Sequence, residues 1–258
     1  MPHILITNDD GVHSPGLLAL AQALCDLGQV SILAPDRNWS VTGHNKTLHK
    51  PLRVWPVTLD DGSQALTTDG GPSDSVALAA MGVVDLPIDL VASGINTRPN
   101  LGDDITYSGT VAAAMEAAIF GIPAMAISQE EGEPRRWETA ARAAAIIARK
   151  MLANGGMPKG TLLNVNVPNL PWDEIKGFEV TRLGQRRYHD ELIVRHDPGG
   201  RPYYWIGGGP PSSVLEPGTD VHALAHGFIS VTPLSLDMTH DAFLTTLRQW
   251  FEPSLTNP

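Results

Sequence analysis

The fold is decided by the stretch HILITNDDGVHSPGLLALAQALCDLGQVSILA, which spans residues 3–34. Its first five residues form an apolar run rich in β-branched side chains, which predicts a buried strand over His3–Thr7. The turn-forming segment Asn8–Gly16 follows, and then a helical pattern covers Leu17–Leu27. Val30–Ala34 predicts a second strand. A strand, a helix and a strand in this order form a βαβ unit, so we expect a parallel sheet.

The same alternation continues towards the middle of the chain and predicts an α/β fold. The fold class that we expect is a Rossmann-like, mostly parallel sheet flanked by helices, with a C-terminal β-rich extension. The predicted strands cover Ile88–Ala92, Ala124–Ser128 and Thr161–Val167. The predicted helices cover Ser73–Val83 with Ser73 as N-cap, Thr110–Phe120, and Arg135–Leu152.

The character of the sequence changes after Pro168, where short β-like runs replace the helical patterns. We therefore divide the chain into an α/β core over residues 1–168 and an extension over residues 169–258. The extension belongs to the same domain and is expected to serve in oligomerisation. Its predicted elements are the strands Phe178–Leu183, Glu191–His196, Tyr203–Ile206 and Gly227–Thr232, a flexible loop at Gly207–Pro211, and a closing helix over Asp241–Phe251.

Composition excludes several classes of protein. The 258 residues hold 18 Lys and Arg against 28 Asp and Glu, a net charge of −10, which disfavours binding to a nucleic acid duplex. An anionic substrate would need a local positive centre. Cys25 is the only cysteine, so a disulfide framework and a thiolate zinc cluster are excluded. We expect no signal peptide and no membrane span, and hence a cytoplasmic protein.

Adjacent carboxylates follow the first predicted strand, at Asp9 and Asp10. In an open parallel sheet, ligands bind beyond the carboxyl ends of the strands, which is where this pair lies. The two charges repel each other unless a cation lies between them, and oxygen ligands of this kind suit Mg²⁺, Mn²⁺ or Ca²⁺. A turn with two solvated aspartates fits the same residues, because Asp-Gly is a common turn pair.

Two other polar loops follow predicted strands and are expected to reach the same edge. Ser40 and Asn96 could add neutral oxygen ligands, although each alone is more typical of a cap or turn residue. Asp103 and Asp104 lie in the second of these loops, where structural turn roles are favoured over ligand roles.

Small residues open the apolar helix at Ser108, Gly109 and Thr110. Free backbone N–H groups at a helix start form an anion site, although a plain N-cap gives the same pattern. A bulky residue at Gly109 is expected to block a phosphate while metal affinity stays nearly intact. His44 could donate to a phosphate or a leaving group, and a packing role fits it equally.

Three segments together resemble the survival protein E (SurE) family of nucleotidases. They are ILITNDDG (residues 4–11), PDRNWS (residues 35–40) and SGINTRPNLGDDITYSGTVAAAMEA (residues 93–117), and the similarity extends to NVNVP (164–168) and SVTPLSLD (230–237). The resemblance implies one divalent cation, Mg²⁺ or Mn²⁺, held by four residues: Asp9, Asp10, Ser40 and Asn96.

The same resemblance implies that Asp9, Asp10 and Asn96 act in catalysis and that phosphate binds at Ser108, Gly109 and Thr110. The implied reaction is hydrolysis of nucleoside monophosphates, as a 5′/3′-nucleotidase that also acts on short polyphosphate, in a homodimer or homotetramer.

Two places depart from the family pattern and leave substrate preference open. Val41 follows Ser40 where glycine is common, and Thr97 and Arg98 replace small residues.

Three functions remain to be compared. The first is a metal-dependent phosphatase, in which a water attacks phosphorus. The second is a nucleotide- or anion-binding sensor that uses the same site without turnover. The third, a sugar-transferring or dinucleotide enzyme, is disfavoured because the first strand is followed by NDDG and not by a glycine-rich fingerprint.

Overall fold

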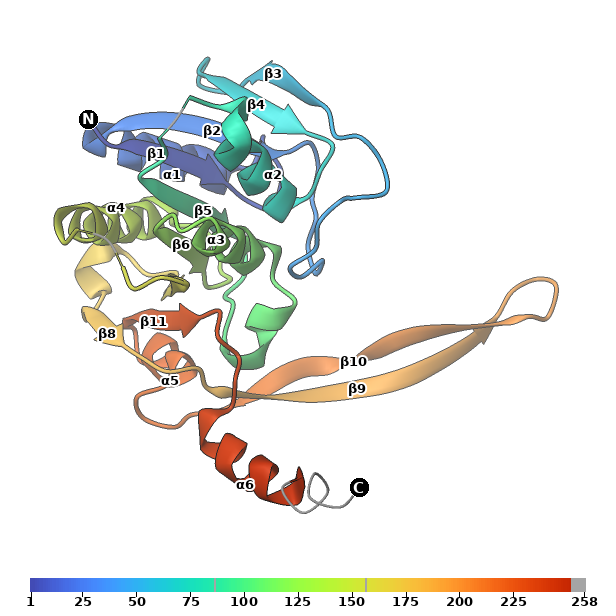
Figure 1. Cartoon of the computed structure of the whole chain (residues 1–258). Helices are drawn as coiled ribbons and strands as arrows, with labels where there is room; N and C mark the ends of the chain where they lie inside the picture. The colour runs from blue at the N-terminus through green and yellow to red at the C-terminus, as the bar shows by residue number, and fades with distance from the viewer. Residues whose placement is uncertain (86, 156, 252–258) are drawn as a thin grey trace, which may run out of the picture.

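A nine-stranded sheet lies at the centre of the described chain, with strand order β3-β4-β2-β1-β5-β6-β7-β11-β8 (Figure 1). The computed structural model describes residues 1–85, 87–155 and 157–251. The inner strands from β4 to β7 pair in parallel, whereas β3 is antiparallel to β4 and β11 is antiparallel to β7. The last strand, β8, is parallel to β11. The strands of the sheet are β1 (His3–Thr7), β2 (Gln29–Pro35), β3 (Val54–Thr58), β4 (Gln64–Thr68), β5 (Leu90–Asn96), β6 (Ala124–Gln129), β7 (Thr161–Val167), β8 (Phe178–Val180) and β11 (Ile229–Ser235).

Helices cover both faces of this sheet. Helices α1 (Pro15–Leu24) and α4 (Trp137–Ala153) pack on one face, and α2 (Pro72–Leu78) and α3 (Gly109–Ile119) pack on the other. Alternate side chains of β1 enter the two cores: Ile4 faces α1, and Leu5 faces α3. Each such buried side chain contributes roughly 1.5–3 kcal/mol. The predicted α/β class with a mostly parallel, helix-flanked sheet is confirmed.

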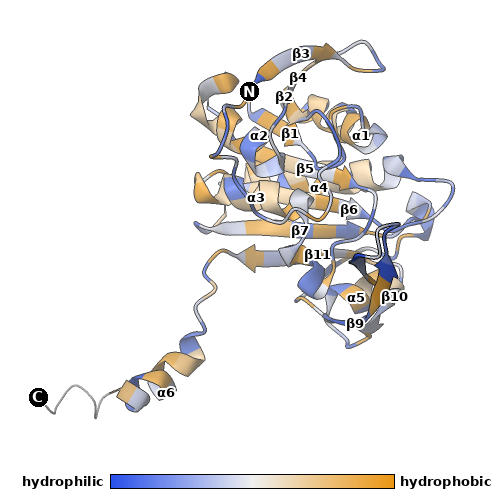
Figure 2. Cartoon of the chain, turned by 90° about the vertical axis from the view of Figure 1, so that its right-hand side faces the viewer, coloured by the Kyte–Doolittle hydropathy of each residue, from blue (hydrophilic) through white to orange (hydrophobic). Residues whose placement is uncertain are grey.

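A long antiparallel hairpin leaves the body of the molecule, formed by β9 (Gln185–His196) and β10 (Pro202–Val214). The last helix, α6 (Asp241–Phe251), stands away from the sheet and buries none of its side chains (Figure 2). Strand β11, by contrast, pairs with β7 and completes the sheet. A short helix, α5 (Asp220–Ala225), precedes β11. In the described part of the chain, no helix has the length and apolarity to cross a membrane.

The structure corrects several predicted elements in the core. Helix α2 begins at Pro72 and its N-cap is Gly71, so Ser73 lies inside the helix and does not cap it. The side chain of Asp74 accepts a hydrogen bond from the Gly71 N–H at 2.9 Å, which satisfies the first turn instead. The strand predicted over Ile88–Ala92 is β5, which begins at Leu90 and continues through Ser93–Asn96, a segment predicted to be a loop. All seven residues of β5 are buried because the strand lies in the middle of the sheet, and its polar residues are therefore buried with the apolar ones.

The sequence analysis did not predict β3, β4 or α5. The two hairpin strands that it predicted are shorter than the observed β9 and β10. The predicted flexible loop at Gly207–Pro211 is wrong, because these residues belong to β10, where Gly207 lies opposite Glu191 and Gly208 opposite Asp190. Gly208 has a φ of +131° and its backbone lies against the His189 carbonyl, a place that only glycine fills without strain.

Candidate active site

A cleft of about 860 Å³ opens at the carboxyl ends of the parallel strands. Five of the predicted site residues line it, and they come from four segments: the loops after β1 and β2, the end of β5, and the start of α3. These five are Asp9, Asp10, Ser40, Asn96 and Ser108. The other predicted residues, Gly109, Thr110 and His44, lie behind or beside the lining. The structure therefore brings together loops that lie far apart in the sequence.

The carboxylate pair occupies the inner end of this cleft. Asp9 is buried, and one of its oxygens accepts a hydrogen bond from the Thr110 hydroxyl at 2.6 Å. Burial, opposed by the Thr110 hydroxyl and reinforced by the charge of Asp10, raises the pKa of Asp9 to about 6. Burial also raises the pKa of Asp10, against a backbone hydrogen bond from Thr97 and the charge of Arg135. Ionising both carboxylates of the pair at once is therefore energetically costly at this position.

Ser40 is brought to the pair by the loop after β2. The Trp39 N–H donates to the carbonyl oxygen of Asp9 at 2.7 Å, and the Asn38 amide donates to Asp10 at 3.3 Å. Ser40 itself is exposed in the cleft. On the opposite side, the Asn96 amide donates to the Arg98 carbonyl at 2.6 Å, so the ligand atom that Asn96 offers is its Oδ1.

The donor set fits a hard divalent cation. Within the described residues no group of three or more His, Cys, Asp or Glu side chains could hold a metal ion, so a site here needs neutral oxygens beside the two carboxylates. The Ser40 hydroxyl and the Asn96 amide oxygen are ligands of that kind. One Asp10 oxygen, Oδ2, is buried without a hydrogen-bond partner, and a cation would satisfy this atom.

The start of α3 lies directly beside the carboxylates. Ser108 is its N-cap and accepts a hydrogen bond from the Val111 N–H at 3.1 Å. The Thr110 hydroxyl is engaged with Asp9, whereas the first backbone N–H groups of a helix have no partner within the helix. A Cβ at Gly109 would lie 2.8 Å from the Asp9 Cβ. This close packing argues against the expectation that a bulky residue at Gly109 spares metal affinity, because the added side chain would press on a predicted metal ligand.

His44 takes a different position from the one that phosphate binding requires. Its Nε2 lies 2.9 Å from a carboxylate oxygen of Glu116 on α3, and it is not among the residues that line the cleft. This contact fits the structural role that the sequence analysis gave as the alternative for His44.

Several side-chain pairs in and around the cleft could not be predicted from the sequence. Arg186 reaches in from β9, and its Nε donates to Asp104 at 2.9 Å. The Tyr188 hydroxyl donates to the other oxygen of Asp104 at 2.6 Å. Arg98 pairs with Glu131 at 2.8 Å on the rim. Each pair joins segments far apart in the chain, so only the folded structure shows them together.

The NVNVP segment has a supporting role below the cleft. The Asn166 and Asn164 amides both donate to the carbonyl of Asn100, and the Asn100 N–H donates back to Asn166 at 2.7 Å. The Asn100 side chain donates to Ser128 on β6. All four side chains are buried, so this network fixes the loop after β5 to the ends of β6 and β7.

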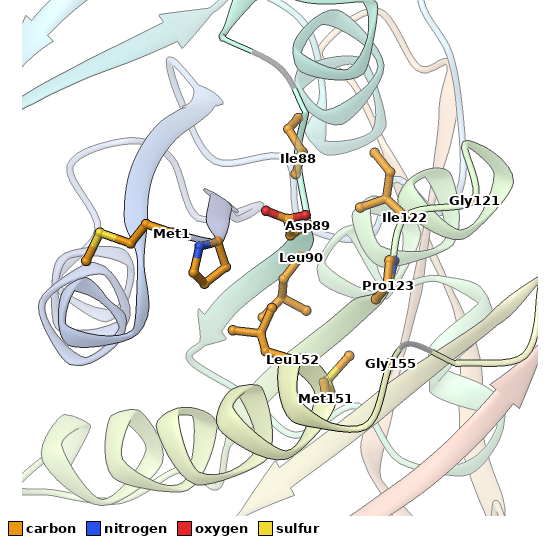
Figure 3. Close-up of a pocket in the computed structure, with 11 residues that line it drawn as sticks. Met1, Ile88, Asp89, Leu90, Gly121, Ile122, Pro123, Met151, Leu152 and Gly155 are labelled. Atoms are coloured by element: carbon orange, nitrogen blue, oxygen red, sulfur yellow. The ribbon is translucent and has the colours of Figure 1, made fainter.

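A second cavity of about 640 Å³ lies at the opposite edge of the sheet (Figure 3). It is lined by residues that precede strands, such as Pro2 before β1, Ile88 before β5 and Pro123 before β6. Of the described residues that line it, Asp89 is the one with a charged side chain. Apolar walls with a single carboxylate do not suit an anionic ligand, and this leaves the carboxyl edge as the candidate site.

Comparison with known proteins places the chain in a family. The family model described as "Survival protein SurE" matches residues 4–190. The chain belongs to the SurE family. It is 49% identical to the 5′-nucleotidase SurE of Chloroflexus aggregans, over 96% of this chain and 98% of that protein. It is 51% identical to the 5′-nucleotidase SurE of Herpetosiphon aurantiacus, over 92% and 94% of the two chains.

A solved structure confirms the fold of this SurE family member. The crystal structure of the SurE protein from Aquifex aeolicus aligns with a TM-score of 0.82 at 43% identity, covering 96% of this chain and 99% of that one. The predicted family resemblance is therefore confirmed over nearly the whole chain.

Proposed function

We propose that this chain is a metal-dependent phosphatase that hydrolyses nucleoside monophosphates to nucleoside and phosphate, with 5′- and 3′-nucleotides and short polyphosphate as its substrate range. The observation that carries the proposal is the pair of adjacent carboxylates, buried Asp9 and half-buried Asp10, in a cleft that also contains the N-cap of α3. The names of the relatives, 5′-nucleotidase SurE, support the same activity and do not favour a sensor without turnover.

Four residues would hold the cation: Asp9, Asp10, Ser40 and Asn96. When bound, Mg²⁺ or Mn²⁺ supplies positive charge that stabilises the phosphoryl oxygens as negative charge develops on them. The backbone N–H groups of Gly109 and Thr110 would orient the phosphate, aided by the helix dipole of α3.

Hydrolysis then needs a water in line with the ester bond. One carboxylate of the Asp9–Asp10 pair accepts a proton from this water as its oxygen attacks phosphorus. The new P–O bond forms, the ester P–O bond breaks, and the leaving nucleoside oxygen takes up a proton.

The test is a phosphate-release assay with 5′- and 3′-nucleoside monophosphates, with and without a chelator. We expect turnover that a chelator abolishes and that added Mg²⁺ or Mn²⁺ restores. Nucleotide binding without phosphate release in the presence of either ion would favour the sensor instead.

The extension after Pro168 is proposed to join copies of the chain into a homodimer or homotetramer. The hairpin exposes large apolar side chains, among them Leu192, Tyr204, Trp205 and Ile206. A two-stranded ribbon cannot cover such side chains by itself, so a second copy is the proposed cover. We also propose a cytoplasmic location, for which the exposed free thiol of Cys25 is support.

A further inference from the structure

A buried carboxylate outside the proposed chemistry joins α3 to the loop that carries Ser40. The side chain of Glu116 is 2% exposed. One of its oxygens lies 2.6 Å from the Lys46 ammonium, and the other lies 2.9 Å from His44 Nε2. Both partners are far more accessible, at 44% and 29% exposure. Glu116 is therefore a buried charge that is compensated entirely by side chains of one surface segment among the described residues.

That segment comprises residues 36–53, which contain no helix or strand. It carries three residues of the cleft, Asn38, Ser40 and Val41. Its two ends are tied down by hydrogen bonds, from the Asp36 N–H to Thr68 and from the Arg53 N–H to Asp69. Between residues 38 and 46, three hydrogen bonds other than those to Glu116 join it to the rest of the described chain: from the Asn38 amide to Asp10, from the Trp39 N–H to the Asp9 carbonyl, and from the Gly43 N–H to the Tyr107 carbonyl. A chain segment without regular hydrogen bonding opens at low cost unless side chains hold it down.

Helix geometry explains why Glu116 is placed to do this. Glu116 follows Gly109 by seven residues, or about two turns, so both lie on the same face of α3. The segment runs along this face, with Ser40 towards the helix start and His44 and Lys46 at Glu116. Helix α3 is buried along ten consecutive residues and offers a rigid support.

We infer that Glu116 is a positioning residue that holds residues 38–46 closed over the cleft through His44 and Lys46. The inference rests on the proposed function, because closure matters through Asn38 and Ser40. A charged hydrogen bond in a buried setting is strong enough to shift such an equilibrium at least about tenfold. Opening of the segment would withdraw Ser40 from the two carboxylates and leave the other side of the cleft in place.

Hydrogen exchange and kinetics together test this. We would compare Glu116→Gln and Lys46→Ala with the control Lys50→Ala. Lys50 belongs to the same segment and pairs with one carboxylate, Asp69 at 2.8 Å, but that contact does not reach α3. The first two variants should exchange the amides of residues 38–46 at least about tenfold faster, while Lys50→Ala should leave them unchanged.

Kinetics separate positioning from a loss of fold. If substrate binds only the closed state, its apparent dissociation constant rises as the closed fraction falls, whereas bound substrate restores closure. We therefore expect KM for a nucleoside monophosphate to rise by the factor by which the closed fraction falls, with kcat within about twofold of the parent. A variant that merely unfolds would lower kcat in proportion to the active fraction and leave KM unchanged. Lys46→Ala alters an accessible side chain and keeps the test informative if Glu116→Gln does not fold.

Parent-like exchange and parent-like KM in Lys46→Ala would overturn the inference, as would an equal effect of Lys50→Ala. Inactivity of the parent towards every nucleotide would instead overturn the proposed function. In that case the exchange of residues 38–46 still decides whether Glu116 holds the segment.

Discussion

Replacing Gly109 by alanine places one methyl group against the carboxylate pair. The added Cβ would lie 2.8 Å from the Asp9 Cβ and 3.0 Å from Asp9 Oδ2, with the Pro72 ring at 3.2 Å on the other side. Ordinary contacts between such atoms begin at 3.4 Å, so the separation from the Asp9 Cβ must grow by about 0.6 Å. Asp9 is buried and hydrogen-bonded to Thr110, and it has little room to yield.

The cost to the fold and the cost to activity should differ. Overpacking costs about 1–3 kcal/mol, and alanine regains up to ~1 kcal/mol of helix propensity over glycine. The net loss is then about 0–3 kcal/mol, which lowers Tm by no more than roughly 10 °C in a chain of this size. A carboxylate displaced by several tenths of an ångström loses a much larger share of catalysis, so we expect phosphate release to fall at least about 100-fold.

The assay is kcat/KM for a nucleoside monophosphate at saturating Mn²⁺, with Mn²⁺ affinity and Tm measured on the same preparation. Gly209→Ala is the matched control, because a Cβ at Gly209 meets no atom within 4 Å and its backbone φ is not positive. Mn²⁺ affinity of Gly109→Ala should fall together with activity. Activity within twofold of the parent would refute the reasoning, since the site would then tolerate a shifted Asp9.

Four further outcomes are expected. Asp10→Asn should abolish phosphate release and leave the Tm of the chelator-treated protein equal or higher, because a buried charge beside Asp9 is removed. Val41→Gly should raise Tm by about 2–6 °C in thermal unfolding, since Val41 has a φ of +60°, which costs a β-branched residue about 1–2 kcal/mol. Burial raises the pKa of Glu116, but the His44 contact and the Lys46 ammonium outweigh this and hold it below 4.5. The Tm advantage of the parent over Glu116→Gln, measured across pH, should therefore be full above pH 4.5 and shrink as pH falls below it. Replacing residues 190–208 by a two-residue turn should lower the mass measured by light scattering, and an unchanged mass would place the subunit contact elsewhere.

The strands and helices whose bounds were predicted correctly are those with a strong local sequence pattern. The bounds of β1, β7 and α6 match the predicted ranges, because each is a periodic or apolar run with turn residues at its ends. Strand β3 was missed because it lies at the sheet edge, where three of its five residues are exposed and the apolar pattern is weak. Strand β4, beside it, was missed because its sequence QALTT holds three polar residues, although two of them are buried.

The candidate site was predictable wherever topology alone decides position. Parallel strands end at one edge, so Asp9, Ser40 and Asn96 could be expected to converge, and the structure places all three in one cleft. Side-chain direction was not predictable in the same way. His44 lies in the expected loop, yet its ring faces Glu116, because a buried carboxylate on α3 attracts the nearest donors. Arg186 comes from a hairpin whose register no local pattern specifies.

The balance of charge in the cleft links the proposed metal to substrate binding itself. Among the described lining residues, four are acidic and two are basic, and each basic residue is already paired with a carboxylate: Arg98 with Glu131, and Arg186 with Asp104. The two charges left over are those of Asp9 and Asp10, where a phosphate would have to approach. A divalent cation on this pair brings the formal charge of the lining to zero and removes the repulsion. The N-terminus of α3 adds only a partial positive charge. It would orient a phosphate once the cation has removed the electrostatic repulsion. We therefore expect the proposed metal to be needed for binding the substrate as well as for hydrolysing it.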